Sequence, residues 1–186
     1  MAKGKTHDKV TLIVSPFIGL VFFMINSELL ENSNKLVIVT LFGVVTYLFG
    51  GFMFSGDLDI KSSEYYRWGK IRFIWNPYQK IFKHRSIFTH GFLLGPIIRI
   101  IYTYIIVLIV CSVLYSLKVI NLATDDLINL TLEYINSNKV ISINIVLALF
   151  LGSGLHTITD LFSSFIKKKF RRKNKIYIKR KNKFIA

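Results

Sequence analysis

The chain has 186 residues, of which 52% are hydrophobic, and yet its formal net charge is +15. A soluble domain seldom combines the two, because an apolar surplus and a charge surplus would occupy the same surface. A membrane protein separates them, with apolar spans in lipid and charge in the loops. The single cysteine, Cys111, lies in an apolar run and excludes both a disulfide framework and a cysteine zinc site.

Four apolar stretches are candidates for membrane spans, and they cover residues 10–25, 36–54, 92–117 and 140–166. A bilayer core of roughly 30 Å needs about 20 helical residues, and the last three stretches meet this length. The first is shorter and follows Lys3, Lys5 and Lys9, so a signal peptide is the alternative to a retained helix. No small-residue cleavage site follows it, which favours the helix. The sequence therefore predicts an all-α integral membrane bundle of about four transmembrane helices.

Lysine and arginine are unequally divided between the two sides of this predicted bundle. The N-terminal arm, the segment 55–88 and the tail from Lys167 hold three, seven and eleven of the 25 cationic residues. The two loops on the opposite side hold three. Because cationic residues concentrate in cytoplasmic loops, both termini are expected to be cytoplasmic. We predict a membrane-embedded domain over residues 1–166 and a basic cytoplasmic tail over residues 167–186.

Two basic segments on the predicted cytoplasmic side have compositions of their own. Ser62–Phe82 interleaves aromatic and basic residues, which suits an interfacial segment at the level of the lipid headgroups. Gly69 and Pro77 are expected to divide it into short helical pieces. The tail is expected to attract anionic lipid headgroups. Either segment resembles a surface that clamps single-stranded nucleic acid, but four spans favour the lipid bilayer as the partner.

Histidine and aspartate gather where the apolar stretches meet this basic side. His156 and Asp160 are four residues apart, so their side chains lie on one helix face and can bind the same ion. Asp160 lies inside an apolar stretch, where an ionised carboxylate costs about 2.5–3.5 kcal/mol and is expected to have a partner. The alternative is a hydrogen-bonded His–Asp pair that only stabilises the bundle.

Two further motifs lie at the same predicted level. Asp57 and Asp59 alternate after the second stretch, where they suit a cation, although a plain helix-terminating turn is the alternative. His84 and His90 are six residues apart and converge only if His84 lies in a loop and His90 begins a helix. A plain surface histidine is the alternative for either ring.

Imidazole and carboxylate groups that converge in a helix bundle form a divalent metal site. The predicted ligands are His7, Asp57, Asp59, His84, His90, His156 and Asp160. Nitrogen and oxygen donors without sulfur favour Zn, with Mn or Fe as alternatives, over Cu(I). Asp59 is the candidate proton acceptor, and Arg85 is the candidate to hold an anionic group such as phosphate. Which of Asp57 and Asp59 is a direct ligand stays open.

Six motifs follow one another along the chain: Gly4–Asp8, Gly56–Ile60, Arg67–Gly69, Trp75–Tyr78, His84–Ser86 and Thr89–Gly91. Together they resemble a bacterial family of uncharacterised metal-binding membrane proteins. That group is similar to predicted membrane-bound metal-dependent hydrolases of the YdjM type, and more distantly to zinc-dependent phospholipases C and zinc single-strand nucleases. The resemblance implies metal binding, phosphoester hydrolysis and a bacterial cytoplasmic membrane, with the ligand roles falling on the histidines and aspartates named above.

Two functions are compatible with these features. The first is a metal-dependent hydrolase that acts on a phosphoester or lipid-like substrate at the cytoplasmic face. The alternative is a non-catalytic metal-binding or sensing membrane protein. A metal permease would need polar residues through the depth of the bundle, and the first three apolar stretches have few.

Overall fold

The computed structural model describes residues 4–185, with side chains up to Arg171. Within this range every element of regular secondary structure is a helix, which confirms the all-α class. The elements are α1 (Gly4–Leu29), α2 (Ser33–Phe52), η1 (Gly56–Asp59), α3 (Ser63–Arg67), η2 (Gly69–Trp75), α4 (Asn76–Ile81), α5 (Ile87–His90), α6 (Leu94–Ser116), α7 (Thr124–Ser137) and α8 (Lys139–Ile185).

Four of these helices are long and apolar enough to cross a membrane. They are α1, α2, α6 and the part of α8 from Lys139 to Arg171. Each overlaps one of the predicted stretches, with α2 ending two residues earlier and α6 beginning two residues later than predicted, and α1 reaches 26 residues where the sequence predicted a shorter span. Their outward faces carry exposed apolar side chains such as Ile13, Leu41 and Ile109. These faces are the kind that lipid covers in a membrane protein.

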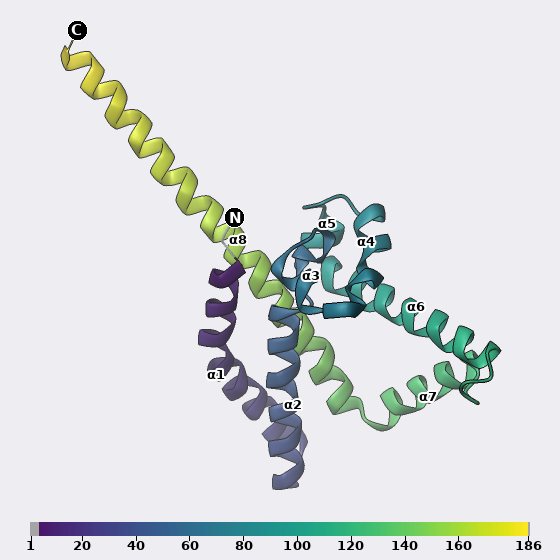
Figure 1. Cartoon of the computed structure of the whole chain (residues 1–186). Coiled ribbons are helices and arrows are strands. Elements are labelled where there is room, and N and C mark those ends of the chain that lie inside the picture. Colours follow the sequence, from purple (N-terminus) through teal and green to yellow (C-terminus); the bar gives the residue numbers. More distant parts are fainter. Residues whose placement is uncertain (1–3, 186) are drawn as a thin grey trace.

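Helices α1, α2 and α8 pack side by side as the central bundle (Figure 1). Phe22, Tyr47 and Ala148 are buried between them. A side chain at Gly152 would overlap the carbonyl oxygen of Tyr47, and one at Gly50 would approach the Leu149 carbonyl oxygen to 3.2 Å. These glycines therefore let α2 and α8 approach closely.

The end of this bundle away from the N-terminus is joined by side-chain amides. The Asn144 side-chain amide donates a hydrogen bond to Asn26 Oδ1 at 2.9 Å, and the Asn26 side-chain amide donates one to the Thr40 hydroxyl at 3.2 Å. Asn26 and Asn144 are buried. Because the three residues come from α1, α2 and α8, this amide cluster links the three helices of the central bundle.

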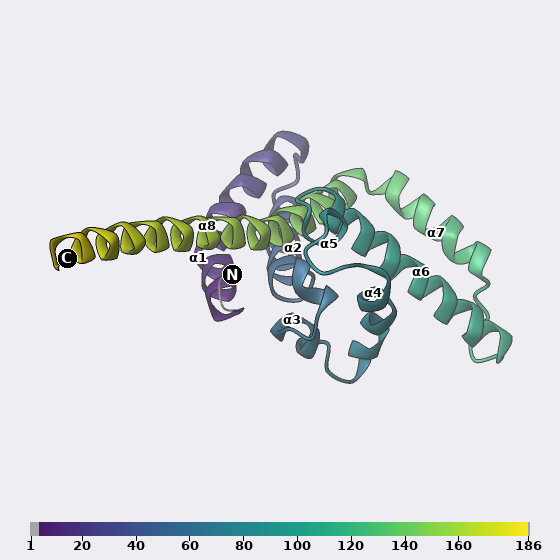
Figure 2. The same cartoon turned by 90° about the horizontal axis from the view of Figure 1, so that it is seen from above.

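The segment from η1 to α5 folds into a compact cap at the end of the bundle where α1 begins and α2 ends (Figures 1 and 2). Gly69 has a φ of +57°, which ends α3 and opens η2, and Pro77 lies in the first turn of α4. The core of the cap consists of Phe54, Leu58, Tyr65, Trp75 and Tyr78. Three of the aromatic rings predicted for the headgroup region are thus buried in protein, whereas Tyr66 and Phe73 are exposed.

Helices α6, α7 and α8 complete the fold. Helix α6 leaves the cap at an angle to the central bundle, and α7 returns the chain to the start of α8 (Figure 1). Residues 118–139, which the sequence predicts as one of the two loops on the side opposite the basic segments, contain α7. Helix α8 does not end near residue 166 but continues as one helix to Ile185. The side chains of the predicted basic tail after Arg171 lie outside the described residues.

Candidate metal centre

Seven side chains predicted as ligands come from four separate segments that meet where the cap joins the central bundle. His7 lies in the first turn of α1, and Asp57 and Asp59 lie in η1. His84 lies in the loop after α4, and His90 is the last residue of α5. His156 and Asp160 lie in α8. The cap and the long helices therefore contribute to one site.

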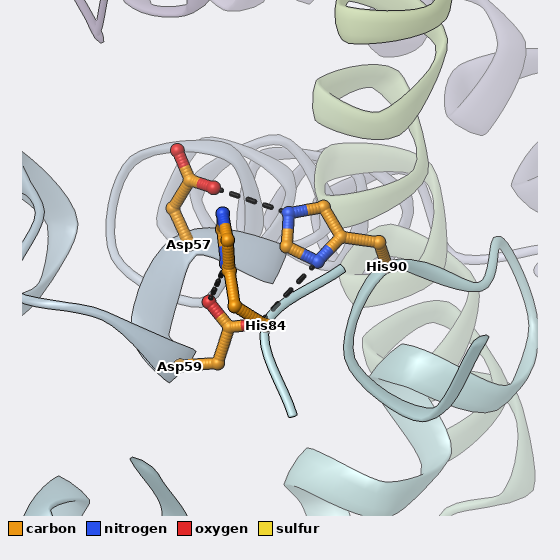
Figure 3. A group of neighbouring side chains, drawn as sticks. All are labelled: Asp57, Asp59, His84 and His90. Atoms are coloured by element: carbon orange, nitrogen blue, oxygen red, sulfur yellow. Dashed lines mark hydrogen bonds and ion pairs between the residues drawn. The ribbon is translucent and has the colours of Figure 1, made fainter. Parts of the chain in front are cut away.

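The first group of candidate ligands consists of Asp57, Asp59, His84 and His90, with one donor atom of each within 4.8 Å of the others. Figure 3 shows the two imidazole rings facing the two carboxylates. Asp59 Oδ1 lies 2.8 Å from His84 Nδ1, and Asp59 Oδ2 lies 3.5 Å from His90 Nδ1. Asp57 Oδ1 lies 3.1 Å from His90 Nε2.

Local backbone structure explains how this group forms. His84 lies in a loop, as the sequence analysis required, but His90 ends α5 and does not begin the third long helix. The short helix turns the His90 ring back toward η1. A Cβ atom at Gly56 would lie 3.1 Å from the ring of His90, so the glycine leaves room for this imidazole.

The second group consists of Asp57, His90, His156 and Asp160, again with donor atoms within 4.8 Å of one another. Asp57 Oδ2 lies 3.5 Å from His156 Nε2. Asp57 and His90 therefore belong to both groups, and Asp57 directs one oxygen toward each side. The two groups share these two side chains, so among the described residues they form one continuous site of six side chains.

His7 belongs to neither group but contacts the second. Its ring stacks on the His156 ring with a centroid distance of 3.9 Å. Its Nε2 atom lies 3.2 Å from Asp160 Oδ1. His7 is 2% exposed, so the first turn of α1 closes the site from one side. This placement suits a residue that orients His156 and Asp160.

Glu64 is a site residue that the sequence analysis missed. It is 1% exposed, and its Oε1 atom lies 3.9 Å from His156 Nδ1. Its other oxygen accepts a hydrogen bond from the Ser63 hydroxyl at 2.9 Å. Glu64 is the sole acidic residue in the aromatic and basic segment Ser62–Phe82, and this was the available signal.

The electrostatics of the site favour ionised carboxylates. Burial raises the pKa of Asp57, but the adjacent imidazole rings of His156 and His90 outweigh it and hold this pKa well below its ordinary value. Asp57 is therefore ionised at neutral pH. Asp59 is 4% exposed and accepts a hydrogen bond from the backbone N–H of Arg85 at 3.3 Å. Such a concentration of buried carboxylates needs cationic partners.

Several buried atoms at the site have no hydrogen-bond partner among the described residues. They are Nδ1 of His7, both ring nitrogens of His156, and Oε1 of Glu64. Buried polar atoms are otherwise nearly always satisfied, so their clustering indicates that the site holds something further. A divalent cation fits, because it would satisfy His156 Nε2 and offset the charge of the carboxylates.

Arg85 and Arg99 flank the site in different ways. Arg85 has a φ of +62°, and its exposed side chain lines a cavity of about 430 Å³ next to His90 and Asp160. Arg99 is buried in α6, where it donates to the Thr89 carbonyl oxygen at 2.7 Å and to the Ser153 hydroxyl. It thereby holds the peptide before His90 against the turn of α8 that precedes His156.

The sequence as a whole was compared with known proteins. Residues 2–170 match the model of a family described as "Uncharacterized metal-binding protein (DUF2227)". No curated protein and no solved structure matches the chain. The match covers both groups of candidate ligands, His7 and Glu64, and it ends close to the last described side chain of α8.

Proposed function

Because the chain belongs to this family of metal-binding proteins, we propose that it is a membrane-embedded metal-dependent hydrolase that acts on a phosphoester or lipid-like substrate at the cytoplasmic face. The observation that carries this proposal is the position of Asp57 between two groups of donors. A carboxylate that faces two cations is suited to a two-metal site, which holds both the attacking and the leaving oxygen of a displacement.

The membrane location rests on two independent features. Four helices have the length and apolar surface of membrane spans. The cationic residues concentrate at the end that carries the site, which supports a cytoplasmic location for that end. We therefore place the protein in the cytoplasmic membrane of a bacterium, with both termini cytoplasmic and the basic end of α8 near anionic lipid headgroups.

The ligand assignment follows the two groups. Asp59, His84 and one oxygen of Asp57 would hold one ion, and His156, Asp160 and the other oxygen of Asp57 would hold the second. His90 lies between them and reaches either position. Zn is the preferred metal, with Mn or Fe as alternatives, since the donors are nitrogen and oxygen without sulfur.

The chemistry divides between the metal and the chain. When bound, such ions activate water as a nucleophile and polarise a phosphoryl oxygen. Asp59 Oδ2 faces the site and is the group that would accept the proton from the attacking water. The Arg85 guanidinium, at the adjoining cavity, would neutralise charge on the phosphate. This division of roles is consistent with kinship to hydrolases of the YdjM type and to zinc-dependent phospholipases C.

A metal sensor without catalysis is the second candidate. One observation favours it: α8 carries His156 and Asp160 and continues without interruption to Ile185. Metal binding near the middle of a long helix can bias the position of its C-terminal half. In that case, the protein would bind metal tightly but leave phosphoesters intact.

One experiment separates the two candidates. The purified full-length protein, loaded with Zn or Mn, is incubated with chromogenic phosphomonoesters and phosphodiesters, beside the Asp57→Asn variant and an exposed control, Asp125→Asn on α7. The hydrolase predicts product release that a chelator abolishes and added metal restores, in wild type and Asp125→Asn but not in Asp57→Asn. Stoichiometric metal without product release from any of these esters would instead support the sensor.

A further inference from the structure

Two cavities adjoin the candidate metal centre along α8. The larger, of about 430 Å³, opens beside the second group of ligands. Its wall combines charged and hydroxyl groups with two apolar side chains, namely Arg85, His90, Asp160, Ser164, Phe92 and Leu161. The cavity therefore offers a site for an anionic group at one side and for hydrocarbon at the other.

The smaller cavity, of about 110 Å³, lies between α1 and α8 and is apolar throughout. Its wall is formed mainly by Val14, Ile18, Tyr47, Phe92, Leu155 and Ile158. The Tyr47 hydroxyl already donates to the Thr11 carbonyl oxygen at 3.2 Å. Among the residues that the structure describes, no other polar side chain lines this cavity and could form a hydrogen bond with a polar ligand, so the cavity suits a hydrocarbon group.

The two cavities lie next to each other along α8, and we refer to them together as the groove. They share the side chain of Phe92, which packs so closely on α8 that a Cβ atom at Gly154 would overlap its ring. On α8 the wall passes from Leu155 through Ile158 and Leu161 to Ser164, a three-residue spacing whose side chains form a ridge that winds around the helix. This ridge spans about 14 Å along the helix axis at a rise of about 1.5 Å per residue.

The groove also has a direction and an entrance. Its polar end lies toward the basic turn of α8 that begins at Lys167, and its apolar end points into the central bundle. Ile158 is 51% exposed and Leu161 is 68% exposed, so the groove opens sideways on the face that lipid would cover. A lipid of the surrounding bilayer has the matching polarity, with its phosphate at the headgroup level and its chain below it.

From this groove we infer that the substrate is a phosphate-bearing membrane lipid that enters sideways, with its phosphate between Arg85 and the metal centre and one hydrocarbon chain in the cavity between α1 and α8. This inference rests on the proposed function and narrows it. The small volume of the apolar cavity suits a single chain, so a second chain of the same lipid would stay in the bilayer.

The test uses phosphonates, which mimic the phosphate but cannot be hydrolysed at the P–C bond. Binding of hexadecylphosphonate and ethylphosphonate to the Zn-loaded full chain in maltoside micelles is measured by calorimetry, and the heat obtained with metal-free protein is subtracted. Ile158→Trp fills the apolar cavity, and Ile101→Trp places the same ring on an equally exposed position of α6 outside both cavities.

We expect wild type and Ile101→Trp to bind the long-chain phosphonate at least about tenfold more tightly than the short one, because only the long chain buries methylene groups. In Ile158→Trp this preference should be lost, while ethylphosphonate binding stays within about twofold, since the metal centre is unchanged. Equal affinities in wild type, a preference that survives in Ile158→Trp, or one that is lost equally in Ile101→Trp would overturn the inference. Because binding is measured without catalysis, a preserved chain-length preference in a protein that cleaves no ester would reject the hydrolase but retain the groove.

Discussion

Asp57 presents one carboxylate oxygen to His90, 3.1 Å from its Nε2 atom, and the other to His156, 3.5 Å from its Nε2 atom. The two histidines are 66 residues apart in the chain and lie in α5 and α8, and the aspartate lies in a third element, η1. Asp57 therefore connects the cap with α8. A change at this single residue is expected to affect both groups of donors, whereas changes at Asp59 or Asp160 affect one group each.

Glu64 is expected to orient His156. Its Oε1 atom faces His156 Nδ1, while His156 Nε2 faces the site, which is the arrangement of a carboxylate that supports a metal-bound histidine. Glu64→Gln should weaken metal binding about 10–100-fold, measured by competition with a metal indicator. The exposed Glu133→Gln on α7 is the matched control and should bind metal as wild type does. Wild-type affinity in Glu64→Gln would show that the pair plays no part in metal binding.

Arg99 is expected to hold the site together without touching the metal. Replacing it by Met removes the donors to the Thr89 carbonyl oxygen and to Ser153 and leaves the acceptors buried. Each lost bond to a charged group is worth about 1.5–3 kcal/mol, so the variant should unfold at a lower temperature than wild type. Arg99→Lys should recover part of this loss. An unchanged unfolding temperature in Arg99→Met would contradict the role assigned to the guanidinium.

The amide cluster at the opposite end of the bundle is expected to be a packing device. Asn26→Leu and Asn144→Leu each remove both hydrogen bonds between the two amides and leave the other amide in place, whereas the double variant removes both amides. A double-mutant cycle on unfolding free energy should give a coupling of about 0.6–1.7 kcal/mol, as for other hydrogen bonds between membrane helices. Metal content should be the same in all four proteins. A coupling near zero would show that the two amides stabilise the bundle separately or not at all.

The proposed orientation can be tested with single cysteines in a Cys111→Ser background. A cysteine at Ser33, the first residue of α2, should react with a membrane-impermeant maleimide added outside intact cells. A cysteine at Lys61 in the cap should react only after the membrane is permeabilised. The reverse pattern would place the metal centre on the outer face and contradict the cytoplasmic location.

The sequence was sufficient for features that depend on short-range spacing. His156 and Asp160 share a helix face because they are four residues apart. The length of the apolar stretches likewise predicted the four long helices. These features depend on helix geometry, which neighbouring residues in the chain determine.

The features that were missed depend on tertiary packing. Trp75 and Tyr78 lie in a segment whose aromatic and basic residues are typical of a membrane interface. Only the fold of the cap shows that their rings form a protein core. Glu64 reaches His156 because α3 packs beside η1, and its local sequence marks it only as the single acidic residue of its segment. Helix α7 was overlooked because it is amphipathic and less apolar than the long helices α1, α2 and α6, so its residues were assigned to a loop.

The most direct test of the metal centre is the metal content of gently purified full-length protein. Elemental analysis of wild type should find about two transition-metal ions per chain, as expected for a two-metal site. The double variant His156→Ala/Asp160→Ala should retain about one, and Asp125→Asn should match wild type. Wild-type protein without bound transition metal, or equal metal content in wild type and the double variant, would contradict the assignment of these ligands.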